Sequence, residues 1–143
     1  ALVERFIEGS EFTVAVIGNK KLQALPVVQI KMDGRFSLGK LYYTFSRINS
    51  TSINYICPAK ISKSMENRLK EVAIRAYRVV ECRDFGRVDI RMDKDNNPFV
   101  LEVNPLPSLS REDVFMTIAE YLGISFEEMV NRLLKQAIDR YGL

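Results

Sequence analysis

Residues 86–107 read GRVDIRMDKDNNPFVLEVNPLP, and their pattern predicts a β-hairpin. Two runs rich in β-branched and apolar residues, GRVDIRM and FVLEVN, flank the turn-forming hexapeptide DKDNNP. The pattern predicts two antiparallel strands joined by a short connection. Their register is set by the alternation of apolar and polar residues, because a slip by one residue would turn the apolar side chains away from the core.

The register that keeps one face of this hairpin apolar places Met92 opposite Phe99. The predicted apolar face consists of Val88, Ile90, Met92, Phe99, Leu101 and Val103. We expect this face to pack against the rest of the domain.

The polar face of the same hairpin predicts a cation site. In this register Asp89 lies opposite Glu102, and Arg87 lies opposite Asn104. Two carboxylates that face each other across a strand pair repel unless a cation or a shared proton compensates. Carboxylate and amide oxygens are ligands that Mg²⁺ accepts, and an arginine beside them suits a phosphate. The alternative is a solvated face on which Arg87 and Arg91 pair with the acids, and the pattern leaves both open.

Other site chemistries are excluded. A calcium loop of the EF-hand type needs Gly where the chain has Pro98 and Glu where it has Asn104. The chain has no histidine, which excludes every His-based catalytic or metal site. Cys57 and Cys82 lack metal-ligand spacing, and we expect reduced, buried thiols.

Length and composition predict one globular domain over residues 1–143, with 47% hydrophobic and 27% charged residues. The net charge of +3 is spread along the chain without a basic cluster, so no nucleic-acid partner is expected. No apolar run is long enough to cross a membrane, and the first residues lack the layout of a signal peptide. These observations predict a cytoplasmic protein with no membrane partner.

The remaining segments predict further strands and a helix. Residues 11–18 and 24–34 are β-rich and are expected to form another hairpin. Residues 35–55 show no clean period and are expected to be loop with some strand. From Ser62 to Val80, apolar residues recur at helical spacing.

Two more helices are predicted near the carboxy terminus. Ser110 is expected to cap a helix over 111–122, with Asp113 at its third position, and Ser125 to cap a helix over 126–141. Strands and helices in these runs predict an α+β fold in which an antiparallel sheet is packed with helices.

Several motifs occur together and in order along the chain. They are VERFIEGSEFTVAV (3–16), ICPAKIS (56–62), AIRAYRVVECRDFGRVD (73–89), RVDIRMDKDNNPFVLEVNPLPSL (87–109) and VFMTIAEYLGISFEEMV (114–130). With them the chain resembles the carboxy-terminal half of D-alanine–D-alanine ligases of the ATP-grasp superfamily. The resemblance covers nearly the whole chain, and it implies the carboxy-terminal domain of the ATP-grasp fold.

The resemblance implies an ATP-dependent carboxylate–amine ligase that works through an acyl phosphate. Asp89, Glu102 and Asn104 match the family's ligands for Mg²⁺ or Mn²⁺, with Glu102 bridging two ions. Arg87 matches the arginine that faces the transferred phosphate. Ser108 is the candidate for the backbone N–H that stabilises the oxyanion.

The same resemblance assigns the nucleotide contacts to the first residues of the chain. Glu4, through its carboxylate, and Ile7, through its backbone, match the hinge that receives adenine, together with Phe6. Glu11 matches the acid that takes the ribose hydroxyls. The chance alternative is a simple strand entry with Phe6 and Ile7 as core residues.

The chain departs from the family pattern at three places. Ser108 stands where the family has Gly, and Asp113 stands where it has a Ser that helps to position substrate. The family's phosphate-touching lysine corresponds to Arg47 when counted without gaps, and to Lys40 only if the alignment shifts. These departures bear on D-alanine specificity more than on the ATP and metal chemistry.

The resemblance also implies that the chain is a fragment of a longer ligase. We expect it to be inactive alone, to need the missing amino-terminal half, and to act with that half on small amino-acid substrates. The alternative is an ATP-grasp-like nucleotide-binding module without ligase activity. A third reading is a structural interaction domain, in which the helix over 126–141 could serve a homodimer.

Overall fold

The computed structural model describes residues 1, 3–42 and 53–143. Its elements in chain order are β1 (Gly9–Ile17), β2 (Gln23–Ala24), β3 (Val28–Met32), β4 (Ser37–Gly39), β5 (Ile53–Ile56), α2 (Lys63–Val79), β6 (Phe85–Asp93), β7 (Pro98–Asn104), α3 (Val114–Leu122) and α4 (Phe126–Tyr141). The predicted α+β fold, an antiparallel sheet packed with helices, is confirmed. No helix in the described ranges is long and apolar enough to cross a membrane.

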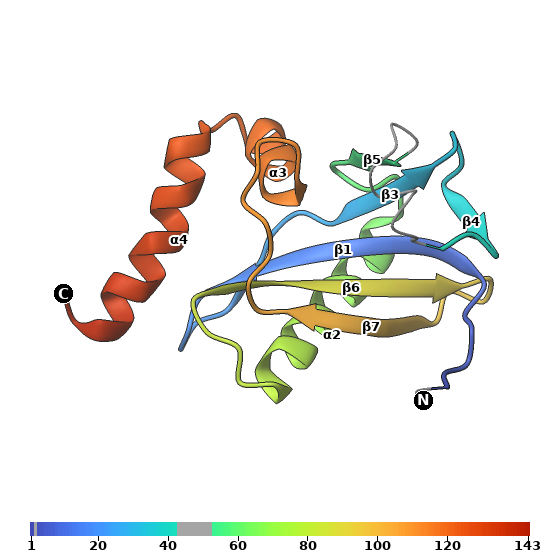
Figure 1. The fold of residues 1–143 in the computed structure, drawn as a ribbon, viewed down its shortest axis with the longest axis horizontal. Coiled ribbons are helices and arrows are strands. Elements are labelled where there is room, and N and C mark those ends of the chain that lie inside the picture. The colour runs from blue at the N-terminus through green and yellow to red at the C-terminus, as the bar shows by residue number, and fades with distance from the viewer. Residues whose placement is uncertain (2, 43–52) are drawn as a thin grey trace.

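The sheet is antiparallel and has the strand order β5-β3-β1-β6-β7, with β2 and β4 also paired to β1 (Figure 1). The predicted hairpin over 11–18 and 24–34 is confirmed as β1 with β2 and β3. β1 also pairs with β6 along its whole length, from Gly9 opposite Asp93 to Ile17 opposite Phe85. This pairing joins the amino-terminal segment to the hairpin that carries the predicted cation site.

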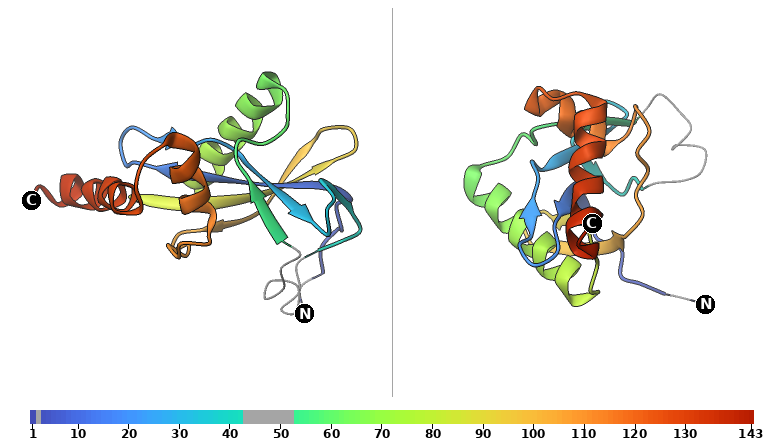
Figure 2. Two further views of the ribbon diagram at one scale, coloured as in Figure 1. Left: turned by 90° about the horizontal axis from the view of Figure 1, so that it is seen from above. Right: turned by 90° about the vertical axis from the view of Figure 1, so that its left-hand side faces the viewer.

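Helix α2 covers one face of the sheet (Figure 2). It begins where predicted, because Ser62 Oγ accepts a hydrogen bond from the Met65 N–H at 3.3 Å. The core on this face includes Leu69, Ala73 and Tyr77 of α2 with Val14, Val88, Ile90 and Met92 of the sheet. Burial of these apolar side chains stabilises the packing of β1 and β6 against α2.

Helices α3 and α4 pack around a second core, which includes Ala15, Ile17, Val28, Phe115, Ile118, Met129 and Leu133. Ser125 caps α4 as predicted, since its Oγ accepts the Glu128 N–H at 3.0 Å. The predicted start of α3 was wrong. The helix begins at Val114, and its cap is Asp113, whose Oδ1 accepts the Val114 N–H at 2.7 Å. Asp113 has extended backbone angles (φ −105°, ψ 177°), so it lies just outside the helix instead of at its third position.

The register of the hairpin formed by β6 and β7 was predicted correctly near Arg87 and Asp89 and wrongly near the turn. Arg87 lies opposite Asn104 and Asp89 opposite Glu102, as expected, but a bulge follows and Phe99 pairs with Arg91 instead of Met92. The extra residue is accommodated because β7 is an edge strand with an exposed middle.

As a consequence, Phe99 and Leu101 leave the predicted apolar face. Phe99 pairs with Arg91 on the polar side of β6, and Leu101 lines a pocket on that same side. Both cysteines are free thiols, as expected, but both are only partly buried and not fully buried as predicted. Burial raises the pKa of the Cys57 thiol to about 11.

Candidate metal and nucleotide site

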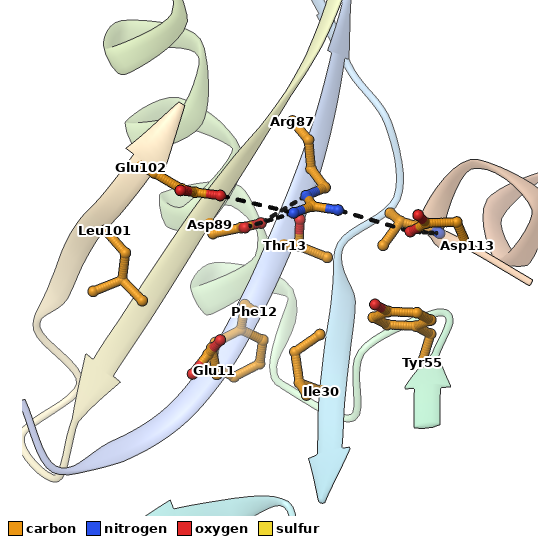
Figure 3. Close-up of a pocket in the computed structure, with 11 residues that line it drawn as sticks. Glu11, Phe12, Thr13, Ile30, Tyr55, Arg87, Asp89, Leu101, Glu102 and Asp113 are labelled. Carbon is orange, nitrogen blue, oxygen red and sulfur yellow. Dashed lines mark hydrogen bonds and ion pairs between the residues drawn. The ribbon is translucent and has the colours of Figure 1, made fainter. Parts of the chain in front are cut away.

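The site is built on the sheet face opposite α2. Strand alternation turns Glu11 and Thr13 of β1 and Arg87 and Asp89 of β6 to this face, because Thr13 pairs directly with Asp89. They line a pocket of about 390 Å³, called the site pocket below (Figure 3). Its lining is Glu11, Phe12, Thr13, Ile30, Tyr55, Arg87, Asp89, Leu101, Glu102, Asp113 and Val114.

Arg87 lies among three carboxylates in this pocket. Its Nε donates to Asp89 Oδ1 at 3.0 Å and its Nη2 to Asp89 Oδ2 at 2.9 Å. Nη2 also lies 3.8 Å from Glu102 Oε1, and Nη1 lies 3.7 Å from Asp113 Oδ1. The two-point contact fixes the plane of the guanidinium group, so Asp89 and Asp113 hold Arg87 from two sides.

Glu102 carries the electrostatic signature of a crowded acidic site. Burial raises its pKa, and the neighbouring charge of Asp89 raises it further. Arg87 lowers it only in part. A cation close to both carboxylates would remove this unfavourable interaction, which is the behaviour expected of a metal-binding pair.

The residues present fit a hard divalent cation. Asp89 and Glu102 offer facing carboxylate oxygens, and Mg²⁺ commonly uses one or two protein carboxylates and completes its shell with water and phosphate oxygens. The described residues contain no group of three His, Cys, Asp or Glu that could hold a metal, so these two carboxylates would need such added oxygens.

One residue in the wall of the site pocket, Thr13, has a buried side-chain oxygen that makes no hydrogen bond to any described residue. Thr13 is 2% exposed, and among the described residues its Oγ1 has no hydrogen-bond partner. A buried hydroxyl without a partner costs about 1–3 kcal/mol, so such a group is rarely kept unless a ligand or a rearrangement satisfies it.

Two predicted residues lie outside the site pocket. Asn104 is opposite Arg87, but its Oδ1 accepts the Leu106 N–H at 3.0 Å in the loop that follows β7. Ser108 is exposed, and its Oγ accepts the Ser110 N–H at 3.2 Å. The metal role of Asn104 and the oxyanion role of the Ser108 backbone stay predictions.

The residues of the predicted adenine hinge are not among those that line the site pocket. Glu4 is exposed and Ile7 partly buried. The Phe6 ring, 48% exposed, lies 5.0 Å from the Arg91 guanidinium carbon and 6.1 Å from the Tyr42 ring. Half-exposed aromatic and aliphatic side chains suit a planar ligand, and the assignment to adenine stays a prediction.

The residue that takes the place of the family's phosphate-touching lysine stays a prediction. Arg47 lies outside the described residues. Lys40 is exposed, and its Nζ lies 3.7 Å from Glu8 Oε1.

Glu11, the predicted ribose acid, lines the pocket and also forms a buried ion pair. Its Oε2 lies 3.3 Å from Arg91 Nη1, and Arg91 Nη2 donates to the carbonyl oxygens of Gly39 at 3.0 Å and Leu41 at 2.6 Å. Burial raises the pKa of Glu11 to about 7, although Arg91 acts in the opposite direction. Asp89 and Glu102 raise this pKa further and Arg87 lowers it.

We expect Glu11→Gln to gain stability relative to the wild type as the pH rises. Between pH 4.5 and about 7, Glu11 binds more protons in the folded wild type than in the unfolded chain. The wild type therefore has its full stability below pH 4.5 and loses part of it as the pH rises to about 7, whereas Glu11→Gln does not titrate. The shift corresponds to about 3 kcal/mol. Urea unfolding of both proteins from pH 4 to pH 8 measures it. A relative stability of Glu11→Gln that falls with pH would show that the Arg91 charge, and not burial, dominates.

Sequence reasoning missed Thr13, and it did not predict that Asp113 contacts Arg87 or that Arg91 pairs with Glu11. Thr13 and Asp113 both contribute to the site pocket, and Arg91 holds Glu11. The period-two pattern starting at Glu11 could have placed Thr13 on the site face, but its contact with Asp89 depends on the long-range pairing of β1 with β6.

Comparison with known proteins decides the family. The family model described as "D-ala D-ala ligase C-terminus" matches residues 1–135. The chain belongs to the D-alanine–D-alanine ligase family. A D-alanine–D-alanine ligase from Desulforamulus reducens is 35% identical over 139 residues, which cover 97% of this chain and 43% of that protein.

Solved structures of ligases share the fold. The VanG D-Ala:D-Ser ligase of Enterococcus faecalis has a TM-score of 0.72 at 26% identity, over 92% of this chain and 37% of that one. A Bacillus anthracis D-alanine–D-alanine ligase complexed with ATP has a TM-score of 0.75 at 20% identity, over 95% and 40%. The chain therefore spans less than half the length of these family members.

Proposed function

We propose that the chain is the ATP- and Mg²⁺-binding carboxy-terminal domain of an ATP-dependent carboxylate–amine ligase. The observation that carries the proposal is the facing pair Asp89 and Glu102, with Arg87 between them and Asp113, in the wall of one pocket. Family membership over residues 1–135 supports it. The ATP complex of a protein with the same fold supports the choice of nucleotide.

In this proposal Asp89 and Glu102, with Asn104, hold Mg²⁺ or Mn²⁺, which neutralises phosphate charge when bound. Arg87 leaves its contact with Asp89 to meet the phosphate that is transferred. Phosphoryl transfer depends mainly on such positioning and electrostatics. Glu11 accepts the ribose hydroxyls from its place in the pocket, and the hinge at Phe6 and Ile7 receives the base.

The proposed reaction has two steps. A substrate carboxylate oxygen attacks the γ-phosphorus of ATP, giving an acyl phosphate and ADP. The amine of a second substrate then attacks the acyl carbon, an amide bond forms, and phosphate leaves while the amine loses a proton. The backbone N–H of Ser108 is the proposed donor to the oxyanion of this second step.

The proposal includes a partner half and a location. An amino-terminal half would supply the first-substrate site and close the nucleotide cleft, and the intact protein would act on amino acids in the cytoplasm. D-alanine is the family substrate. Asp113, whose carboxylate lies 3.7 Å from Arg87, is the reason why the proposal does not name D-alanine as the substrate of this protein.

A second candidate is a nucleotide-binding module that no longer ligates. The contacts of Arg87 favour it, because a guanidinium group held by Asp89 and Asp113 is less available to a phosphate.

A trapping assay on the full-length protein separates these candidates. Hydroxylamine converts an acyl phosphate to a hydroxamate, so we expect equal amounts of ADP and hydroxamate when Mg²⁺, ATP and the correct amino acid are present. The assay is scanned across D- and L-amino acids. Binding of ATP without hydroxamate from any amino acid would support the second candidate, and hydroxamate from D-alanine would establish the family substrate.

A further inference from the structure

Thr13 is a buried hydroxyl that the proposed function leaves without a role. It lies in the central strand β1, it is 2% exposed, and its Oγ1 has no hydrogen-bond partner within residues 1, 3–42 and 53–143. The neighbouring positions of β1, Phe12 and Val14, are apolar and fully buried. A valine at position 13 would have nearly the same shape without the orphaned hydroxyl.

The side chains around Thr13 belong to the proposed cation site. Thr13 is the direct cross-strand partner of Asp89, and it lies beside Arg87 and Asp89 in the pocket wall (Figure 3). The Asp89 carboxylate is a strong hydrogen-bond acceptor on this neighbouring residue. Its two oxygens accept hydrogen bonds from Arg87 at 3.0 and 2.9 Å, so Arg87 sets the orientation of this carboxylate, and in this orientation the carboxylate makes no hydrogen bond to Thr13.

Arg87 cannot take the place of that acceptor. A guanidinium group has only donors, and here its Nε and Nη2 are directed to Asp89, while Nη1 lies 3.7 Å from Asp113. A different orientation of the Asp89 carboxylate, without its two hydrogen bonds from Arg87, would offer the Thr13 hydroxyl an acceptor.

We infer that Thr13 is a positioning residue for Asp89 in the cation-bound state. When Arg87 leaves Asp89 for a phosphate, the Thr13 hydroxyl donates to the released carboxylate and holds it in the orientation that binds the cation. The inference rests on the proposed function, because it needs a cation at Asp89 and Glu102. In this inference Thr13 lowers the stability of the cation-free protein and raises the stability of the cation-bound protein.

The test compares Thr13→Val and Thr13→Ser in the full-length protein. The valine variant removes the hydroxyl and keeps the shape, whereas the serine variant keeps the hydroxyl and removes a methyl group. Mn²⁺ serves as the probe, with affinity measured by electron paramagnetic resonance in the presence of ADP. Thermal unfolding without metal reports the stability of the free state.

We expect opposite effects of the valine substitution on stability and on cation binding. Thr13→Val should raise the unfolding midpoint without metal by about 2 °C or more, because an unsatisfied buried group is lost. The same variant should weaken Mn²⁺ binding about tenfold, because Asp89 loses its donor. Thr13→Ser should lower the midpoint and keep the Mn²⁺ affinity within about twofold of the wild type.

Thr117→Val is the matched control. Thr117 Oγ1 donates to the Asp113 carbonyl oxygen at 3.3 Å, so its hydroxyl is satisfied, and it does not line the site pocket. We expect no gain in stability and no change in Mn²⁺ affinity from this variant.

The outcomes separate the inference from the proposed function. Wild-type Mn²⁺ affinity in Thr13→Val, together with its loss in Glu102→Gln, would overturn the inference and leave the proposed function intact. A lower midpoint in Thr13→Val would also overturn it, because the hydroxyl would then be satisfied in the free protein. Mn²⁺ binding that does not depend on Glu102 would overturn the proposed cation site and the inference with it.

Discussion

Glu102→Gln in the full-length protein is expected to lower Mg²⁺-dependent ADP release about 100- to 1,000-fold, the range typical for loss of one electrostatic group at a reacting centre. The amide keeps the shape of the side chain but removes one of the two charges that face each other across β6 and β7. Cation binding depends on that charge, so Mn²⁺ affinity should fall as well. Steady-state ADP release at saturating ATP measures the effect.

The stability of Glu102→Gln provides a separate check on the site. Burial and the charge of Asp89 raise the pKa of Glu102, so its ionised form is unfavourable in the folded protein. The variant should therefore be at least as stable as the wild type at pH 8 without metal. Glu120→Gln is the control, because Glu120 is an exposed carboxylate on α3 outside the site pocket. Equal losses of activity in both variants would contradict a specific role for Glu102.

The site end of the hairpin could be predicted because its alternation is strict. Val88 must face α2, which leaves Asp89 and Glu102 on the opposite side. The turn end could not be predicted in the same way. The middle of β7 is exposed, so its side chains do not have to stay on one buried face, and a bulge can place Leu101 in the site pocket.

The chemistry of the site was only partly accessible from the sequence. The facing carboxylates are local features of one hairpin, and they were found. Thr13 and Arg91 act through contacts between β1 and β6, which are distant in sequence, and no short-range pattern specifies that pairing. The contact of Asp113 with Arg87 depends on where α3 begins, and helix ends are the least certain part of a sequence-based assignment.

Gly9→Ala is expected to destabilise the full-length protein by about 3 kcal/mol or more. Gly9 has φ +154°, a backbone region that residues with a side chain rarely adopt, and this strain costs about 1–3 kcal/mol. A Cβ at this position would clash with the Met92 carbonyl oxygen and lie 2.9 Å from its carbon, which adds an overpacking cost of about 1–3 kcal/mol. Urea unfolding, followed by circular dichroism, measures the loss.

Gly123→Ala separates the close contact from the backbone strain. Gly123 ends α3 with φ +68°, and an added Cβ there would meet no atom within 4 Å, so only the strain of about 1–2 kcal/mol is expected. Equal losses in the two variants would show that the strands can separate at Met92 without further cost. A larger loss at Gly9 would show that the close approach of β1 to the Met92 backbone tolerates no side chain at position 9. This strand contact lies next to Arg91, whose guanidinium carbon is 5.0 Å from the Phe6 ring.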